Sequence, residues 1–226
     1  MSTILWPVGV LRPRNVSFDI YPRTLAGPTS VSGKTQVVSS DAGIWRIKFG
    51  DITVSNRAEV LTWRGVDSLL EGRLNPVLVP FCRAYQPVPS GAVAAGLYDD
   101  VPHDDDTPFD DESEYVPTVI EVETSASASA GAVSIGVTIG YADTIVPGQP
   151  FSIGERAYRV RTIVYASATA ATITFRPPLR EAVSSAAKLN FDDPVCRMRL
   201  ASDAEMALDL GGRRRSTQTV NFVEDV

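Results

Sequence analysis

Histidine and cysteine are nearly absent from this sequence, and their scarcity limits the chemistry open to it. His103 is the single histidine, so zinc sites built from several histidines and mechanisms that need two imidazoles are excluded. Cys82 and Cys196 are too few for a disulfide framework or a four-cysteine metal site. They could form one bridge, but we expect both to be reduced, buried, apolar groups in a protein made in a reducing cytoplasm.

Long apolar runs and an excess of basic charge are also missing. No segment reaches the roughly 18–20 apolar residues that span a bilayer. Residues 1–7 lack the basic start and apolar stretch of an export signal, so we expect no membrane contact. With 21 basic and 27 acidic residues the net charge is −6, which excludes a wholly basic surface for nucleic acid.

The residues that are present predict a globular, mainly β protein. The apolar fraction of 44% is enough for a core, and 226 residues suit one large domain or two ordinary ones. Alternating apolar and polar residues predict short strands, and 16 prolines and 16 glycines separate them. Gly154-Glu155 is a predicted hairpin tip. The expected strands lie at 44–49, 119–122, 133–139, 151–153, 158–164, 171–175, 195–200 and 217–223.

One helix is predicted over residues 57–70. Asn56 can cap it, Glu59 can complete a capping box, and Gly72 can end it. We interpret it as an element that covers a sheet, and we expect Trp6, Trp45 and Trp63 to be core anchors. The residues that fall near its predicted buried face are Ala58, Leu61, Thr62, Gly65, Val66, Leu69 and Leu70.

Two interruptions of the strand pattern, at 86–115 and 176–194, suggest an insertion. We expect residues 1–115 plus 191–226 to form a larger β-sandwich domain with one flanking helix. Residues 116–190 would form a small β-barrel inserted into it.

Acidic residues gather in one stretch, 99–114, which we call the acidic segment. It holds nine carboxylates and no Lys or Arg, so the remaining chain carries a charge of +3. No EF-hand register fits, which leaves open a calcium site of another kind, a rim that faces a polyanion, or a solvated loop. The candidate interaction residues are Asp99, Asp100, Asp104, Asp105, Asp106, Asp110, Asp111, Glu112 and Glu114.

A second charged cluster, Arg213, Arg214 and Arg215, follows two glycines. It could bind phosphate or an acidic partner surface, including the acidic segment of a neighbouring subunit, or it could be solvated. The sequence has no nucleophile elbow, phosphate-binding loop or dinucleotide fingerprint, and no two carboxylates are placed for glycoside hydrolysis. We therefore expect no catalysis, no cofactor and no metal.

Three segments together resemble a family of tailed-bacteriophage proteins encoded near the tail tape-measure gene. They are the helix and following strand, from Trp63-Arg64 to LEGRLNPVLVPF at 70–81, then VPHDDDTPFDD at 101–111, and the stretch from VPGQPFSIGERAYRV at 146–160 through ITFRPPLR at 173–180 to DPVCRMRL at 193–200. In the second, Asp stands where the family pattern has Ser and Gly. The resemblance extends over roughly residues 45–225.

The resemblance implies a tail-tip protein of a phage with a long non-contractile tail, similar to distal tail proteins. Such proteins form a ring, expected to be a hexamer, that joins the tail tube protein to the hub and to the tape measure or fibres. DNA would pass through the lumen without specific binding, and the protein would be assembled into the virion in the host cytoplasm. Alternatives are another virion joint, such as a head–tail connector or a tube-completion protein, and a carbohydrate-binding β module for host recognition.

Overall fold

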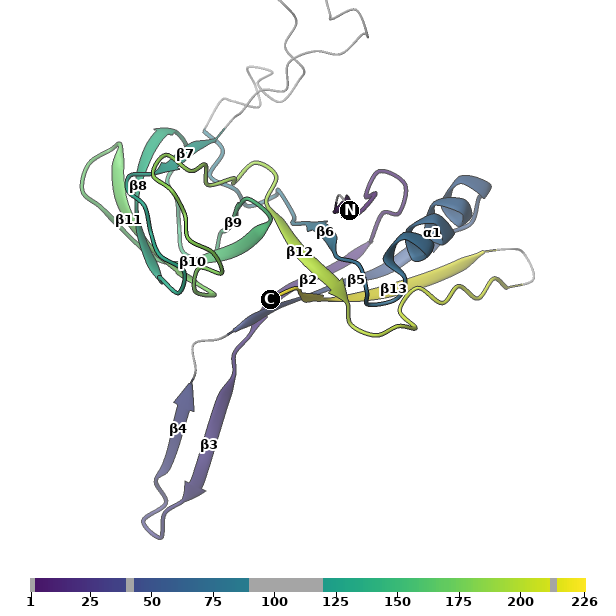
Figure 1. The fold of residues 1–226 in the computed structure, drawn as a ribbon, viewed down its shortest axis with the longest axis horizontal. Helices are drawn as coiled ribbons and strands as arrows, with labels where there is room; N and C mark the ends of the chain where they lie inside the picture. The colour runs from purple at the N-terminus through teal and green to yellow at the C-terminus, as the bar shows by residue number, and fades with distance from the viewer. Residues whose placement is uncertain (1–2, 40–42, 90–119, 212–214) are drawn as a thin grey trace, which may run out of the picture. The chain divides into compact units, whose positions relative to one another are not determined.

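The computed structural model describes residues 3–39, 43–89, 120–211 and 215–226, of which 46% lie in strands (Figure 1). The predicted mainly β class, with a single helix among the described residues, is confirmed. The chain divides into two compact units. Unit 1 comprises Met1–Phe81, Arg176–Pro178 and Val195–Val226, and unit 2 comprises Cys82–Phe175 and Leu179–Pro194. The sequence predicts folding domains at 1–115 plus 191–226 and at 116–190. The compactness of the two units does not test whether either domain folds independently, so this division stays a prediction.

Unit 1 contains a six-stranded sheet in the order β1-β6-β12-β13-β5-β2. β1 runs parallel to β6, and every other neighbouring pair is antiparallel. Its strands are β1 (Ile4–Leu5), β2 (Asn15–Tyr21), β5 (Ile44–Val54), β6 (Val77–Pro80), β12 (Val195–Leu200) and β13 (Ser216–Glu224). Along β5, Trp45, Ile47 and Phe49 are buried and alternate with exposed residues, as the predicted period of two requires.

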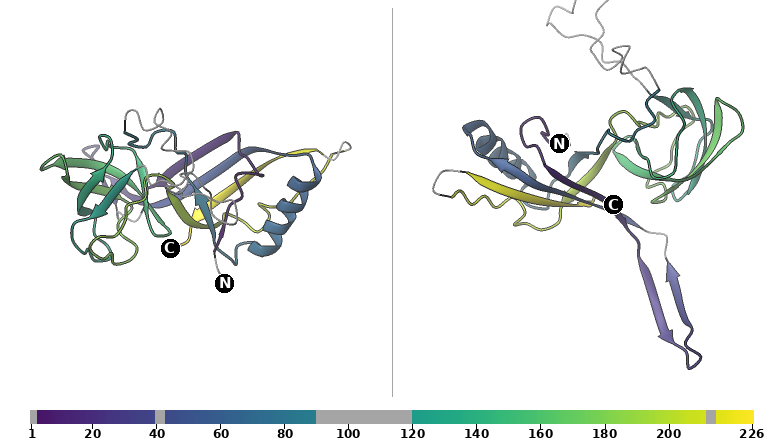
Figure 2. Two further views of the ribbon diagram at one scale, coloured as in Figure 1. Left: turned by 90° about the horizontal axis from the view of Figure 1, so that it is seen from above. Right: turned by 180° about the vertical axis from the view of Figure 1, so that it is seen from behind.

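The helix α1 (Arg57–Leu70) lies beside this sheet (Figures 1 and 2), and its ends are those that the sequence predicts. The Asn56 side chain accepts a hydrogen bond from the backbone N–H of Glu59 at 2.9 Å. The Glu59 carboxylate accepts one from the backbone N–H of Asn56 at 3.1 Å, which completes the capping box. At the other end Glu71 adopts a left-handed conformation, and Gly72 follows with φ of +65°.

The buried face of α1 differs from the predicted one. Trp63, Val66 and Leu70 are buried, whereas Leu61 and Leu69 are 54% and 57% exposed. Trp63 decides the rotation of the helix, because its indole packs edge-on against Trp6 at 6.4 Å. Its indole N–H also donates to the carbonyl of Met206 at 2.8 Å. The three tryptophans are core anchors, as predicted, with no exposed surface.

Unit 2 is built on a five-stranded antiparallel sheet in the order β7-β8-β11-β10-β9, which curls into a half-barrel (Figure 2). Its strands are β7 (Glu121–Thr124), β8 (Ser134–Tyr141), β9 (Pro150–Ile153), β10 (Arg156–Tyr165) and β11 (Ala170–Arg176). The hairpin tip at Gly154-Glu155 is confirmed, since β9 and β10 pair on either side of it. Isolated bridges Glu123↔Lys188 and Ser152↔Asn190 tie the segment 183–190 to both edge strands of the sheet.

Candidate assembly surfaces

Strands β3 (Thr24–Thr29) and β4 (Thr35–Ser39) form a separate two-stranded sheet, which we call the hairpin arm. The two strands pair with each other antiparallel and with no third strand of a described sheet (Figure 1). Its turn is held by Ser30, whose side chain accepts from the backbone N–H of Lys34 at 3.2 Å, and by Gly33 with φ of +76°. The arm therefore has a defined turn and a defined register.

Apolar side chains on both faces of the hairpin arm are open to solvent. Leu25 pairs with Val38 and Ala26 pairs with Val37, and directly paired residues project to the same face. Leu25, Val37 and Val38 are 77%, 61% and 58% exposed. Because a two-stranded ribbon cannot bury either face by itself, an isolated hairpin of this kind is at best marginally stable in water. The geometry thus favours a partner surface that covers the arm.

The six-stranded sheet ends in an edge that can accept another strand. β2 pairs with β5 on one side over seven residues, from Asn15↔Gly50 to Tyr21↔Ile44, and has no described strand on the other side. Such an edge offers a row of backbone donors and acceptors to a strand from another chain. Together with the hairpin arm, it gives unit 1 two surfaces of the kind that join β subunits.

The exposed side of α1 adds apolar surface to unit 1. Leu61 and Leu69 project from it two turns apart, and the nearby Leu74 is 63% exposed. A groove of about 450 Å³ runs beside Leu61, lined also by Val60 and Leu210. A face with large apolar side chains at helical spacing resembles the faces that helices bury against neighbouring elements.

A larger groove in unit 1, of about 760 Å³, is lined by three arginines, and we call it the arginine groove. Arg12 and Arg14 come from the chain before β2, and Arg215 precedes β13. All three are exposed, and no described carboxylate forms an ion pair with any of them. Arg12 donates its Nε–H to the carbonyl of Gly9 at 3.1 Å.

The single carboxylate in the lining of the arginine groove is already engaged. Glu59 accepts hydrogen bonds from the backbone N–H of Ser55 at 2.7 Å and from its hydroxyl at 3.1 Å, in addition to the capping bond from Asn56. The bond from the Ser55 backbone is the main cause that lowers the pKa of Glu59. The groove therefore presents three guanidinium groups against one ionised carboxylate that is tied to the helix cap.

Two other carboxylates have shifted pKa values, and each has a structural partner. Burial of Asp225 would raise its pKa, but hydrogen bonds and charge from Arg199 and Arg197 outweigh burial and lower it. The pKa of Asp192 is raised, because its burial outweighs the opposite effect of the hydrogen bond that it accepts from the backbone N–H of Ile120. Asp225 lies in unit 1 and Asp192 in unit 2, so they do not form an acid–base pair within one unit.

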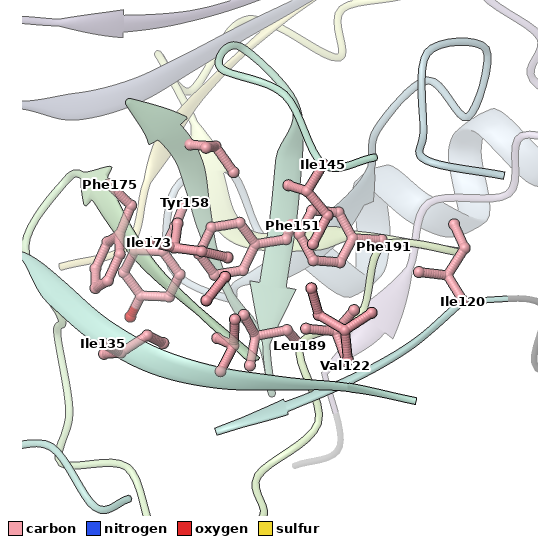
Figure 3. Close-up of a cluster of buried hydrophobic side chains, with 14 of the residues drawn as sticks. Ile120, Val122, Ile135, Ile145, Phe151, Tyr158, Ile173, Phe175, Leu189 and Phe191 are labelled. Atoms are coloured by element: carbon pink, nitrogen blue, oxygen red, sulfur yellow. The ribbon is translucent and has the colours of Figure 1, made fainter. Parts of the chain in front are cut away.

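Four aromatic side chains of unit 2 are turned inward, whereas Tyr85, Tyr141 and Tyr165 of the same unit are 81%, 47% and 41% exposed. Phe151 lies at the centre of the cluster, with ring centroids 5.3–5.8 Å from those of Tyr158, Phe175 and Phe191 (Figure 3). Tyr158 is almost fully buried, and its hydroxyl accepts a hydrogen bond from the backbone N–H of Arg180 at 3.2 Å. These rings fill the core of the curled sheet and offer no stacking surface to a ligand.

Most of the interaction residues that were predicted from the sequence lie outside the described residues. This applies to all nine carboxylates of the acidic segment, to His103, and to Arg213 and Arg214. Arg215 is described, and it is exposed in the arginine groove. The expectation that both thiols are buried is wrong for Cys82, which is exposed, whereas Cys196 is buried.

The described residues offer neither a metal centre nor a membrane-spanning helix. They contain no group of three or more His, Cys, Asp or Glu side chains that could hold a metal ion. No helix within them is long and apolar enough to cross a bilayer. The candidate site is the set of surfaces on unit 1, namely the hairpin arm, the free edge of β2, the exposed side of α1 and the arginine groove.

Sequence reasoning missed the hairpin arm and two of the three arginines of the groove. Thr35, Val37 and Val38 carry β propensity, but Gly27 and Pro28 interrupt β3, and a bulge between Ala26 and Thr29 breaks its alternation. A turn signal at Ser32-Gly33 between short β-prone runs could have located the arm.

Comparison with known proteins adds no family to these observations. The sequence matches no protein-family model, and no curated protein is significantly similar to it.

Proposed function

We propose that this protein is a non-enzymatic structural subunit that assembles into a ring at the distal end of a phage tail. The observation that carries the proposal is the hairpin arm, whose apolar residues are exposed on both faces. Exposed apolar surface at a sheet end with a defined register is typical of subunit contacts. A neighbouring copy would bury the arm, and repetition of that head-to-tail contact would close a ring.

The place of this ring in a virion rests on the resemblance of segments 70–81, 101–111 and 146–200 to tail-tip proteins. In this proposal unit 1 is a tail-tube-like β-sandwich that forms the ring, and unit 2 is a small barrel that serves as a platform. The ring, expected to be a hexamer, would join the tail tube protein to the hub and to the tape measure or fibres. Carboxylates of the acidic segment, if they faced the lumen, would repel DNA phosphates and help the genome slide.

The same surfaces would serve another virion joint, such as a head–tail connector or a tube-completion protein. Labelling the C-terminus and imaging intact particles distinguishes these roles, because the label marks the distal tip of the tail in one case and the head–tail junction in the other. A carbohydrate-binding module is the other alternative, and its stacking residues would be the exposed Tyr85, Tyr141 and Tyr165 of unit 2, because the rings of the core cluster are buried.

The test replaces the exposed apolar residues of the arm in the full chain. The triple variant Leu25→Thr, Val37→Thr and Val38→Thr keeps β propensity but places hydroxyl groups where apolar contact is proposed. If each site is buried in the assembly, each change costs about 1–2 kcal/mol, which together weakens association by roughly 10²–10⁴-fold. The matched control, Val146→Thr with Val164→Thr, changes valines that are 46% and 68% exposed in unit 2.

Sedimentation and mass photometry over a range of protein concentrations measure the outcome. We expect rings for the unmodified chain and for the control, and monomers for the arm variant. Because association stabilises the folded state, the unfolding transitions are compared at a concentration at which every chain is monomeric, where the arm variant should match the unmodified chain. An unmodified chain that stays monomeric at every concentration and never enters a particle refutes the proposal.

A further inference from the structure

We propose that the arginine groove binds the acidic segment, residues 99–114, of a neighbouring copy of this chain. The inference rests on the proposed ring and names a contact that would set its direction. Arg12, Arg14 and Arg215 supply the positive charge, and no described carboxylate neutralises them through an ion pair. Arginine is suited to this contact because its planar guanidinium can hold a carboxylate through two parallel hydrogen bonds.

The charge of the chain is divided in a way that fits this contact. The acidic segment contributes nine negative charges without a single Lys or Arg, and the remainder of the chain has a net charge of +3. A positive groove and a negative segment on one chain are complementary but not identical surfaces. Such a pair produces heterologous, head-to-tail contacts, which close into rings when the rotation between subunits allows it.

The length of chain around the acidic segment permits the contact. Residues 90–119 connect described parts of unit 2 and are anchored at both ends. Thirty residues span at most about 100 Å when extended, so their middle can reach about 50 Å from the anchors. A segment tethered within a ring is present at an effective concentration of about millimolar, so a weak charge contact is enough to keep it bound. Nucleic acid lacks this advantage, and the acidic segments themselves would repel it.

Charge reversal on each side tests the contact in the full chain. Variant A carries Arg14→Glu and Arg215→Glu. Variant B carries the Asp→Lys change at Asp100, Asp104, Asp105, Asp106, Asp110 and Asp111, which changes the charge of the acidic segment from −9 to +3. A copy of A repels another copy of A, and B repels B, but the reversed groove of A attracts the reversed segment of B. The remaining pair, the native groove of B and the native segment of A, is also attractive, so an equimolar mixture can form alternating rings.

We expect A and B alone to associate at least about ten-fold more weakly than the unmodified chain, and their mixture to recover its assembly. The matched control for variant A, Lys48→Glu with Arg161→Glu, makes the same change in charge as A at exposed positions outside the groove and should assemble normally. Thermal unfolding of each variant checks that the units remain folded.

Several results overturn the inference. Variant A that assembles like the unmodified chain removes the groove from the contact. If A and B do not rescue each other but one chain with all eight changes assembles, the segment binds within its own chain. If duplex DNA binds the unmodified chain and variant A loses DNA binding but keeps assembly, the groove serves nucleic acid. An unmodified chain that never associates overturns both the proposed ring and this contact. If the unmodified chain forms rings but variants A and B do not behave as expected, only this contact is overturned.

Discussion

Two adjacent leucines of α1 provide a sharp test of how the helix is oriented. Leu70 has no exposed surface, whereas Leu69 is 57% exposed, although both close the same helix and have the same side chain. Leu70→Ala removes a fully buried side chain and leaves a cavity, which costs about 2–5 kcal/mol. Leu69 buries less than half of its side chain, and alanine is an equally good helix former. We therefore expect Leu69→Ala to lower the free energy of unfolding by about 0.5 kcal/mol.

Urea unfolding followed by tryptophan fluorescence measures this difference in unit 1, because Trp6, Trp45 and Trp63 all belong to that unit. With a slope of about 1–3 kcal/mol per molar urea, Leu70→Ala should lower the midpoint by roughly 1–2 M. The measurement is made at a protein concentration at which the chain is monomeric, since association stabilises the folded state. Equal losses for the two variants would refute the described orientation and restore the face predicted from the sequence.

Two further predictions concern single side chains. Asp225→Asn should cost about 1–2 kcal/mol at neutral pH, because the carboxylate binds Arg197 and Arg199 at 2.9 and 2.6 Å. Since the pKa of Asp225 is lowered by folding, its stabilisation is complete above the unfolded-state value of about 3.9 and is lost as the pH falls through the folded-state value. The difference in unfolding free energy between variant and unmodified chain should therefore shrink in acid; a constant difference would contradict the ion pairs. Cys82 should react rapidly with a thiol reagent and Cys196 only after unfolding, so Cys82→Ser should abolish fast labelling while Cys196→Ser preserves it.

Local chemistry made the helix predictable, and distant packing made its orientation unpredictable. Asn56, Glu59 and Gly72 act within a turn of the helix ends, so the sequence is enough to place those ends. The helix carries apolar residues on two faces, and the sequence contains no local reason to bury one of them. Trp6 makes that choice by packing against Trp63, and it comes from a segment before β2.

The arginine groove illustrates the same limit. Arg14 immediately precedes β2, whose first residue, Asn15, pairs with Gly50 of β5. Arg215 immediately precedes β13, whose first residue pairs with Val54, further along the same strand. Because both neighbours pair with β5 over its last five residues, the order of strands in the sheet brings the arginines to one groove. The sequence alone shows Arg213–Arg215 as an isolated basic run.

The hairpin arm and the arginine groove would contribute to assembly through different forces. Their contributions can therefore be separated by the choice of salt. Exposed Leu25, Val37 and Val38 would contribute to assembly through apolar burial, which salts such as sulfate strengthen. The arginine groove would contribute through charge, whose range falls from about 10 Å at 0.1 M salt to about 3 Å at 1 M. An assembly held by both contacts should therefore loosen first as sodium chloride rises, yet be recovered in sulfate if the arm supplies most of the free energy. If assembly is lost in both salts, the arginine groove supplies the dominant contact. Charge would then also set the head-to-tail direction of the ring.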